Sequence, residues 1–159
     1  MYSSDSKRAL DTATAIAAPL GLPVIADPRF REIASGEWEG LLVDEIKARW
    51  PDLWGPARHY SRRPGGESPP EVRTRALAGV RAAVKAHPDS AIVIVSHGGT
   101  IRWISAEALG YDDRRSARIR GLGNGSIVTI EAVIEDGALR LSGLVRMDGS
   151  TPDLDDPND

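Results

Sequence analysis

Apolar residues in the first half of the chain follow a helical period, then a strand-like run, then a helical period again. The predicted elements, in order, are a helix from residue 3 to about 20, a strand over 23–26, a loop over 30–40 and a helix over 43–50. Ser3, Ser4 and Asp5 offer N-cap oxygens to the first helix, and Gly21 suits the position after its end.

The second half begins with a stretch rich in Pro, Gly and Arg and returns to regular patterns after it. The predicted elements are a surface excursion over 52–66, a helix from about 69, a strand over 91–95, a helix over 100–109 and strands over 126–135 and 138–146. Residues 91–95 are continuously apolar and β-branched, which predicts a parallel strand covered on both faces. Asp136 and Gly137 predict a hairpin between the last two strands.

This order of elements predicts the fold class. We expect an α/β protein, a three-layer α/β/α sandwich around a mostly parallel sheet, formed by one domain over residues 1–147. Residues 148–159 include five aspartates and one leucine, so this acidic tail is expected to be disordered.

Composition and charge exclude several classes of partner. The chain of 159 residues is 41% hydrophobic and 27% charged, and its net charge is -3. It therefore has no overall positive charge that would attract it to nucleic acid or to an anionic membrane. It has no cysteine for a disulfide or thiolate site, no apolar run of membrane-spanning length and no signal-peptide pattern. These features predict a cytoplasmic protein.

The strongest local signal is a histidine directly after the apolar strand. The segment Ser-His-Gly-Gly at 96–99 places His97 at the carboxyl end of that strand and at the start of a helix. Ligands of open α/β sheets bind at such ends, and helix N-termini attract anions. A turn histidine bonded to backbone is the alternative, but the position favours a functional role for His97 in binding phosphate or moving a proton.

Two further segments carry candidate groups that are weak when taken alone. Arg8 lies in the first turn of its helix, where it could hold a phosphate, although such arginines are more often solvated charges. Glu32, Glu37 and Glu39 surround Trp38, and one of these carboxyl groups could serve as a general acid. An acidic surface loop anchored by Trp38 is slightly favoured on this evidence.

The excursion ends in a fourth candidate segment. Arg62 and Arg63 could bind part of a substrate or simply be surface charges, and Glu67 could orient an arginine or favour a helix N-terminus. The three histidines of the chain have no metal-ligand spacing, so no metal is expected.

Together and in order, these segments resemble the histidine phosphatase superfamily, the group of phosphoglycerate mutases and related phosphatases. The resemblance rests on Ser-Ser-x-x-x-Arg-Ala at 3–9, Arg-Glu-Ile at 31–33, Gly-Glu-Ser at 66–68, Ser-His-Gly-Gly at 96–99 with Ile-Arg at 101–102, and Asn-Gly-Ser-Ile at 124–127. It covers nearly the whole chain up to about residue 128.

The resemblance implies both a mechanism and the roles of four residues. In the family a histidine attacks phosphorus, and water or an acceptor hydroxyl resolves the phosphohistidine. Arg8 matches the arginine that binds the phosphate. His97, with Gly98 after it, matches the second histidine, which contacts the phosphoryl group. Glu32 matches the general acid. A small phosphorylated metabolite is the implied partner, and no cofactor is implied.

Two activities remain open within the family. The interval between residues 40 and 96 is short, whereas mutases typically insert a longer cap here, so we favour a phosphatase. Arg62 and Arg63 leave an acidic substrate possible, such as a phosphoglycerate derivative, and with it mutase-type phosphotransfer.

The chain departs from the family pattern at its first residues. The family begins with a strand that ends in Arg-His-Gly and supplies the nucleophile, and these 159 residues have no counterpart. We expect a truncated form that is inactive alone, because Met1 stands where the family often has Val and a GTG codon can serve as a start. A non-catalytic, phosphate-binding remnant is the alternative. The absent strand would be central in the sheet, so an exposed edge makes a homodimer plausible.

Overall fold

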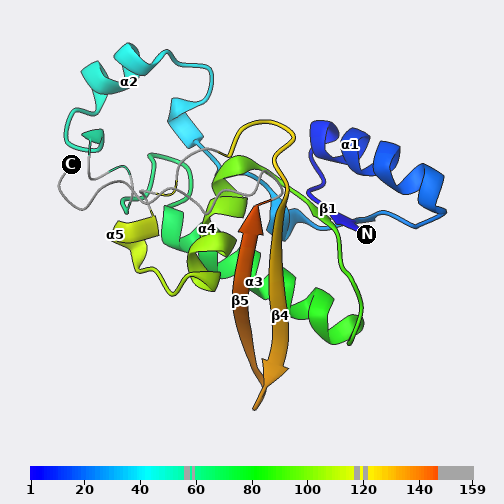
Figure 1. Ribbon diagram of the computed structural model, residues 1–159. Coiled ribbons are helices and arrows are strands. Elements are labelled where there is room, and N and C mark those ends of the chain that lie inside the picture. Colours follow the sequence, from blue (N-terminus) through cyan, green and yellow to red (C-terminus); the bar gives the residue numbers. More distant parts are fainter. Residues whose placement is uncertain (56–57, 59, 117–118, 120–121, 147–159) are drawn as a thin grey trace.

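The computed structural model describes residues 1–55, 58, 60–116, 119 and 122–146 and has the expected α/β architecture (Figure 1). Its strands are β1 (Tyr2–Ser3), β2 (Ile25–Ala26), β3 (Ile94–Val95), β4 (Val128–Glu135) and β5 (Ala138–Arg146). Its α-helices are α1 (Lys7–Ala17), α2 (Val43–Arg49), α3 (Pro69–Ala86), α4 (Gly98–Ala108) and α5 (Asp113–Ser116), and its 3₁₀ helices are η1 (Ala18–Leu20), η2 (Pro28–Phe30) and η3 (Gly36–Trp38).

The parallel sheet has β1 at its centre, between β2 and β3. Tyr2 N–H donates to the Val93 carbonyl at 2.9 Å, and Ser4 N–H donates to the Val95 carbonyl at 2.9 Å. This register places the residues that follow β1 beside those that follow β3. Two segments about 90 residues apart in sequence therefore meet at the carboxyl edge of the sheet.

The first residues form a strand, so the prediction that Ser3, Ser4 and Asp5 cap the first helix is wrong. Ser3 belongs to β1, and the N-cap of α1 is Ser6, whose side chain makes no capping hydrogen bond. The backbone of residues 1–4 is instead satisfied by pairing with β2 and β3. Such pairing depends on the tertiary structure, which a local capping pattern does not reveal.

Helices cover the two sides of the sheet, with α1 on one side and α3 and α4 on the other (Figure 1). The main core cluster consists of Tyr2, Phe30, Ala76, Val80, Ala83 and Ile104. Apolar residues of the β4–β5 hairpin pack against this cluster, so the hairpin is part of the same hydrophobic core.

The apolar run over residues 91–95 is less covered than its sequence predicts. Only Ile94–Val95 is strand, and Val93 is 43% exposed. Among the described residues β3 pairs with β1 alone, because β4 and β5 form a separate two-stranded antiparallel sheet. The predicted hairpin turn is confirmed, with positive φ at Asp136 and Gly137.

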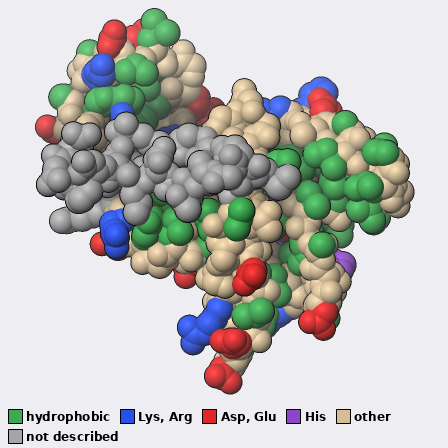
Figure 2. Space-filling model, viewed as in Figure 1, with side chains coloured by type: hydrophobic (Ala, Val, Ile, Leu, Met, Phe, Trp, Pro, Cys, Tyr) green, Lys and Arg blue, Asp and Glu red, His purple; other side chains and the backbone are tan. Residues whose placement is uncertain are grey.

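Exposed apolar side chains gather over the far end of α1 and the segment after it (Figure 2). They are Ile16, Leu20, Leu22 and Ile25.

Two predictions are not tested by the structure. The homodimer remains a prediction, and the predicted acidic tail at 148–159 lies outside the described residues. Within the described part of the chain, no helix has both the length and the apolar character needed to span a bilayer.

Candidate active site

His97 lies at the start of α4, directly after β3, and is 8% exposed. Its Nε2 atom is 3.0 Å from Ser4 Oγ and 3.1 Å from Ser6 Oγ, and its Nδ1 atom is 3.0 Å from Arg8 Nη2. A guanidinium group can only donate, so Nδ1 accepts and the ring proton lies on Nε2. The β1–α1 turn and the first turn of α1 thus fix the orientation and the tautomer of the imidazole.

The surroundings of His97 favour its neutral form. Burial lowers the pKa of His97, the positive charge of Arg8 lowers it further, and the carboxylate of Glu32 opposes both effects. A neutral imidazole at physiological pH can donate one hydrogen bond from Nε2 to an oxygen of a bound anion.

Glu32 reaches the same helix terminus from the loop between η2 and η3. Its Oε2 atom accepts a hydrogen bond from Gly99 N–H at 3.1 Å, and its Oε1 atom accepts one from Ile33 N–H at 3.0 Å. A Cβ atom at Gly99 would lie 2.3 Å from Glu32 Oε1, so any other residue here would displace the Glu32 carboxylate from this position. The second glycine of the Ser-His-Gly-Gly segment is therefore explained by Glu32.

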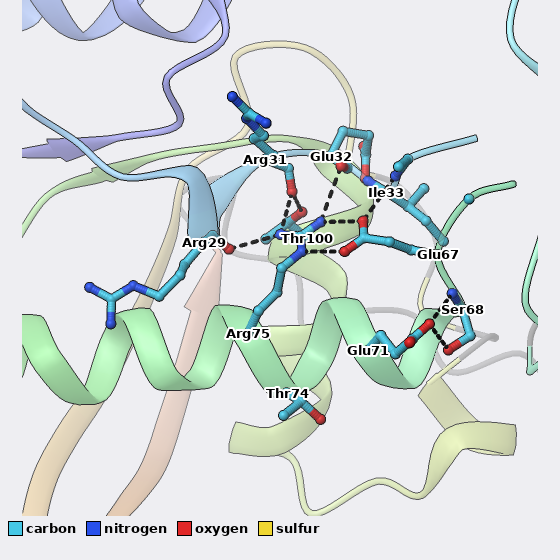
Figure 3. Close-up of polar contacts among 12 residues, drawn as sticks. Arg29, Arg31, Glu32, Ile33, Glu67, Ser68, Glu71, Thr74, Arg75 and Thr100 are labelled. Carbon is cyan, nitrogen blue, oxygen red and sulfur yellow. Dashed lines mark hydrogen bonds and ion pairs between the residues drawn. The ribbon is translucent and has the colours of Figure 1, made fainter. Parts of the chain in front are cut away.

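Arg75 of α3 holds the backbone on either side of Glu32 (Figure 3). Its Nη1 atom donates to the carbonyls of Arg29 and Arg31, both at 2.8 Å, and its Nη2 atom donates to the carbonyl of Glu32 at 3.1 Å. Its Nε and Nη2 atoms also bind the Glu67 carboxylate at 2.8 and 2.9 Å. We call Arg75, Glu67 and these three carbonyl groups the Arg75 network.

The loop that carries Glu67 also packs closely against the loop that follows Glu32. Glu67 N–H donates to the Ala34 carbonyl at 3.0 Å, and a Cβ atom at Gly66 would lie 2.3 Å from that oxygen. Glu67 Oε2 accepts the Ala34 N–H at 3.0 Å, and hydrogen bonding to Arg75 is the largest of the effects that lower the pKa of Glu67. The predicted role of Glu67 in orienting an arginine is thus present, with Arg75 as the arginine.

Of two ion pairs in this region, Asp5–Arg31 connects two segments of the site and Arg62–Glu71 does not. Asp5 accepts hydrogen bonds from Arg31 Nε and Nη2 at 2.6 and 2.5 Å, which joins the β1–α1 turn to the loop that carries Glu32. Arg62 instead donates to the Gly66 carbonyl at 2.5 Å and pairs with Glu71, so its guanidinium is already engaged within its own segment and the start of α3. Arg62 is therefore the less favoured of the two predicted substrate-binding arginines.

Arg63, the other predicted substrate-binding arginine, is half-buried and lies near Glu32. Its Nη1 atom donates to Ser35 Oγ at 2.6 Å, and its guanidinium lies 5.4 Å from the ring centroid of Trp38. Glu32 is close enough for its charge to affect the pKa of Arg63. Of the three glutamates around Trp38, Glu37 and Glu39 are exposed, and Glu32 alone binds the start of α4.

The structure brings together three groups that the sequence predicted, namely Arg8, Glu32 and His97. Sequence reasoning missed the two serine hydroxyls on the imidazole, because Ser4 was assigned to helix capping and Ser6 was given no role. Within the described residues no group of three potential ligands could hold a metal ion. His87 Nε2 lies 3.1 Å from the Tyr2 hydroxyl, which keeps His87 away from His97, and His59 lies outside the described residues.

Comparisons with known proteins identify the family to which this chain is similar. The family model of the histidine phosphatase superfamily (branch 1) matches residues 1–144. The chain is 34% identical to a glucosyl-3-phosphoglycerate phosphatase of Mycolicibacterium vanbaalenii, over 94% of this chain and 65% of that protein. It is 35% identical to phosphoserine phosphatase 1 of Hydrogenobacter thermophilus, over 70% of this chain and 54% of that protein. The chain thus spans less than two thirds of the length of these relatives.

A solved structure shares the fold. The native structure of the mycobacterial glucosyl-3-phosphoglycerate phosphatase superposes with a TM-score of 0.78 at 30% sequence identity. The match covers 94% of this chain and 77% of that chain. The predicted fold class, an α/β protein of the phosphoglycerate mutase-like type, is confirmed by this likeness.

Proposed function

Because this chain belongs to the histidine phosphatase superfamily, we propose that it binds small phosphate monoesters between Arg8, Glu32 and His97 and serves in their hydrolysis. The observation that carries the proposal is the contact of Arg8 Nη2 with His97 Nδ1 at 3.0 Å, at the edge of the sheet where Glu32 meets α4. A cation, a neutral imidazole and a carboxyl group thus surround one helix N-terminus.

Each of these groups has a distinct part in the proposed reaction. Arg8 is exposed and has guanidinium N–H groups left to bind phosphoryl oxygens. His97 donates from Nε2 to a phosphoryl oxygen in place of Ser4 or Ser6, and Gly98 lets the substrate approach the start of α4. Glu32, in its protonated form, gives its proton to the leaving alkoxide.

The proposed route passes through a phosphohistidine, and His97 is not the attacking group. Both of its ring nitrogens are engaged by Ser4, Ser6 and Arg8, and it is the single imidazole at the site within the described residues. A nucleophilic histidine beyond those described is therefore part of the proposal. We expect turnover to depend on that histidine.

Binding of inorganic phosphate, measured by calorimetry, tests the first half of the proposal. Arg8→Gln should weaken binding about tenfold or more, since it removes a charge-assisted contact. Lys7→Met is a matched control, because Lys7 is the adjacent residue and its exposed ammonium pairs with Asp11. Equal effects of the two substitutions would mean that only the overall charge of α1 matters and would contradict the assigned role of Arg8.

Turnover tests the second half, on the protein as its host cell produces it. Glu32→Gln should slow hydrolysis of glycerol 3-phosphate far more than that of p-nitrophenyl phosphate, because nitrophenolate leaves without a proton. Equal losses on both substrates would show that Glu32 is not the general acid. If the protein binds phosphate but shows no turnover, it is a non-catalytic phosphate-binding protein. If the 159-residue polypeptide hydrolyses phosphate esters and His97→Asn abolishes this activity, His97 is the nucleophile.

A further inference from the structure

The side chains around His97 form a chain of hydrogen bonds whose direction can be assigned from one end. Arg8 Nη2 lies 3.0 Å from His97 Nδ1, and a guanidinium group can only donate, so the proton of the neutral imidazole lies on Nε2. Nε2 lies 3.0 Å from Ser4 Oγ and 3.1 Å from Ser6 Oγ. The imidazole therefore donates toward these two hydroxyl oxygens and accepts a hydrogen bond from neither.

The Ser4 hydroxyl is fully used inside the protein. Ser4 is 0% exposed, and its oxygen accepts from His97 Nε2 at 3.0 Å and from Ser6 N–H at 3.3 Å. Its own hydrogen is donated to Ser6 Oγ at 3.2 Å. A hydroxyl group has one hydrogen and two acceptor positions, so Ser4 has nothing left to offer a ligand.

The Ser6 hydroxyl, by contrast, keeps its hydrogen for a partner outside this chain of bonds. Its oxygen accepts from Ser4 Oγ and lies beside the protonated Nε2 of His97, so neither group can accept the Ser6 hydrogen. The described residues supply no other acceptor for it. Ser6 is only partly buried, so this hydrogen is available to a ligand of the site.

We propose that Ser6 is a further phosphate-binding residue, whose hydroxyl donates to an oxygen of the bound phosphoryl group beside Arg8 and His97. The inference rests on the proposed function, because it adds a donor to the same site. Ser6 Oγ lies 3.1 Å from the ring nitrogen that is proposed to donate to a phosphoryl oxygen. Hydrogen bonds that a hydroxyl group donates to an anion are short and strong.

The order of donors is unchanged when phosphate is bound. If His97 Nε2–H turns from the serines to a phosphoryl oxygen, Ser6 Oγ still accepts from Ser4 Oγ, and its hydrogen still points away from Ser4. Ser4 holds Ser6 in place in both states, because it also accepts the Ser6 N–H. Arg8, His97 and Ser6 then each supply a donor to one phosphoryl group.

A purely structural role for the Ser6 hydroxyl fits the structure less well. Ser6 is the N-cap of α1, but its side chain makes no capping hydrogen bond, so the hydroxyl does not stabilise the start of this helix in the usual way. As a partner of the imidazole it duplicates Ser4, which lies slightly closer to Nε2 and is fully buried.

Binding of inorganic phosphate to the 159-residue polypeptide, measured by calorimetry, tests the inference. Ser6→Ala should weaken binding about tenfold, the effect of losing one hydrogen bond to an anion. Ser6→Thr keeps the hydroxyl and should retain most of the affinity. Thr14→Ala is the matched control, because it removes an exposed hydroxyl about two turns further along the same helix and should leave the affinity unchanged.

The ring nitrogens of His97, followed by NMR, separate direct binding from an effect that passes through the imidazole. In phosphate-free Ser6→Ala, His97 should remain the Nε2–H tautomer, because Arg8 still donates to Nδ1 and Ser4 still accepts from Nε2. A change of tautomer in this variant would show that Ser6 acts by orienting His97, and the inference would be wrong.

The outcomes separate the two proposals. Saturable phosphate binding that Ser6→Ala weakens less than about twofold, or that Ser6→Thr weakens as much as Ser6→Ala does, overturns the inference and leaves the proposed function standing. If inorganic phosphate itself does not bind, the proposed function fails and the inference fails with it.

Discussion

The arginines near Glu32 are of two kinds. The side chain of Arg75 is 20% exposed, and its donors meet three carbonyl groups and the Glu67 carboxylate. Arg63 and Arg102 are half-buried, and each keeps a buried Nε atom that has no hydrogen-bond partner. The Arg75 network therefore holds the loops around the site together, whereas the Nε atoms of Arg63 and Arg102 are buried without a compensating hydrogen bond.

The largest effect is expected from Arg75→Met. The substitution leaves the Glu67 carboxylate and three carbonyl groups without their donor, and we expect the free energy of unfolding to fall by about 3 kcal/mol. Urea unfolding followed by circular dichroism measures it. A loss below about 1 kcal/mol would mean that water replaces the guanidinium readily, and the contrast between Arg75 and the other two arginines would then disappear.

A second prediction concerns the contact between the two loops beside the Arg75 network. Gly36 has a φ of 56°, and a Cβ atom there would lie 2.1 Å from the Pro64 carbonyl oxygen. Gly36→Ala should cost about 2 kcal/mol, from left-handed backbone strain plus the clash. Gly40→Ala is the matched control, since Gly40 also has a positive φ but no atom near its Cβ position. Equal losses would show that the loops separate easily.

The third and smaller effect is a pH dependence that comes from His97. Its folded pKa lies below the unfolded value of about 6.5, so between the two the unfolded chain holds more protons. The free energy of unfolding should therefore fall as pH drops from 7.5 to 5.5, and less so in His97→Asn. The lowered pKa values of Asp5 and Glu67 act only at more acidic pH.

His87→Asn serves as the control for this pH experiment, because His87 contacts Tyr2 rather than Arg8. An undiminished pH dependence in His97→Asn would contradict the assignment to His97.

The smallest effect is expected from Arg102→Met. The substitution removes a half-buried charge without an ion pair, so we expect no loss of stability and a gain of up to about 1 kcal/mol. The same urea series that measures Arg75→Met measures it. A loss comparable to that of Arg75→Met would show that Arg102 is a structural residue, and the two arginines would then be alike.

Much of this fold could be predicted from local patterns. The helix at Val43–Arg49, the start of the helix at Pro69 and the β4–β5 hairpin follow from hydrophobic period and turn residues. The two-residue strand β1 could not be predicted in this way, because Ser3 and Ser4 also fit a helix cap and only pairing with β2 and β3 decides between the two.

Some residues of the site could likewise be predicted from the sequence, and others could not. Arg8, Glu32 and His97 were predicted from motifs, and the structure brings them to one edge of the sheet. Arg75 lies in ordinary helical sequence, and Arg102 was noted only as part of the motif around His97, so the local sequence predicts no role for either guanidinium. Their different roles depend on which carbonyl and carboxylate groups the fold places around each guanidinium, and that information resides in the tertiary structure.

The central claim is that Arg8, Glu32 and His97 form one phosphate site. The most direct test is an NMR titration of the histidine ring nitrogens with inorganic phosphate. The account predicts that His97 begins as the Nε2–H tautomer and shifts saturably, that His87 does not shift, and that Arg8→Gln abolishes the response. Saturable phosphate binding that leaves the His97 ring unchanged would contradict it.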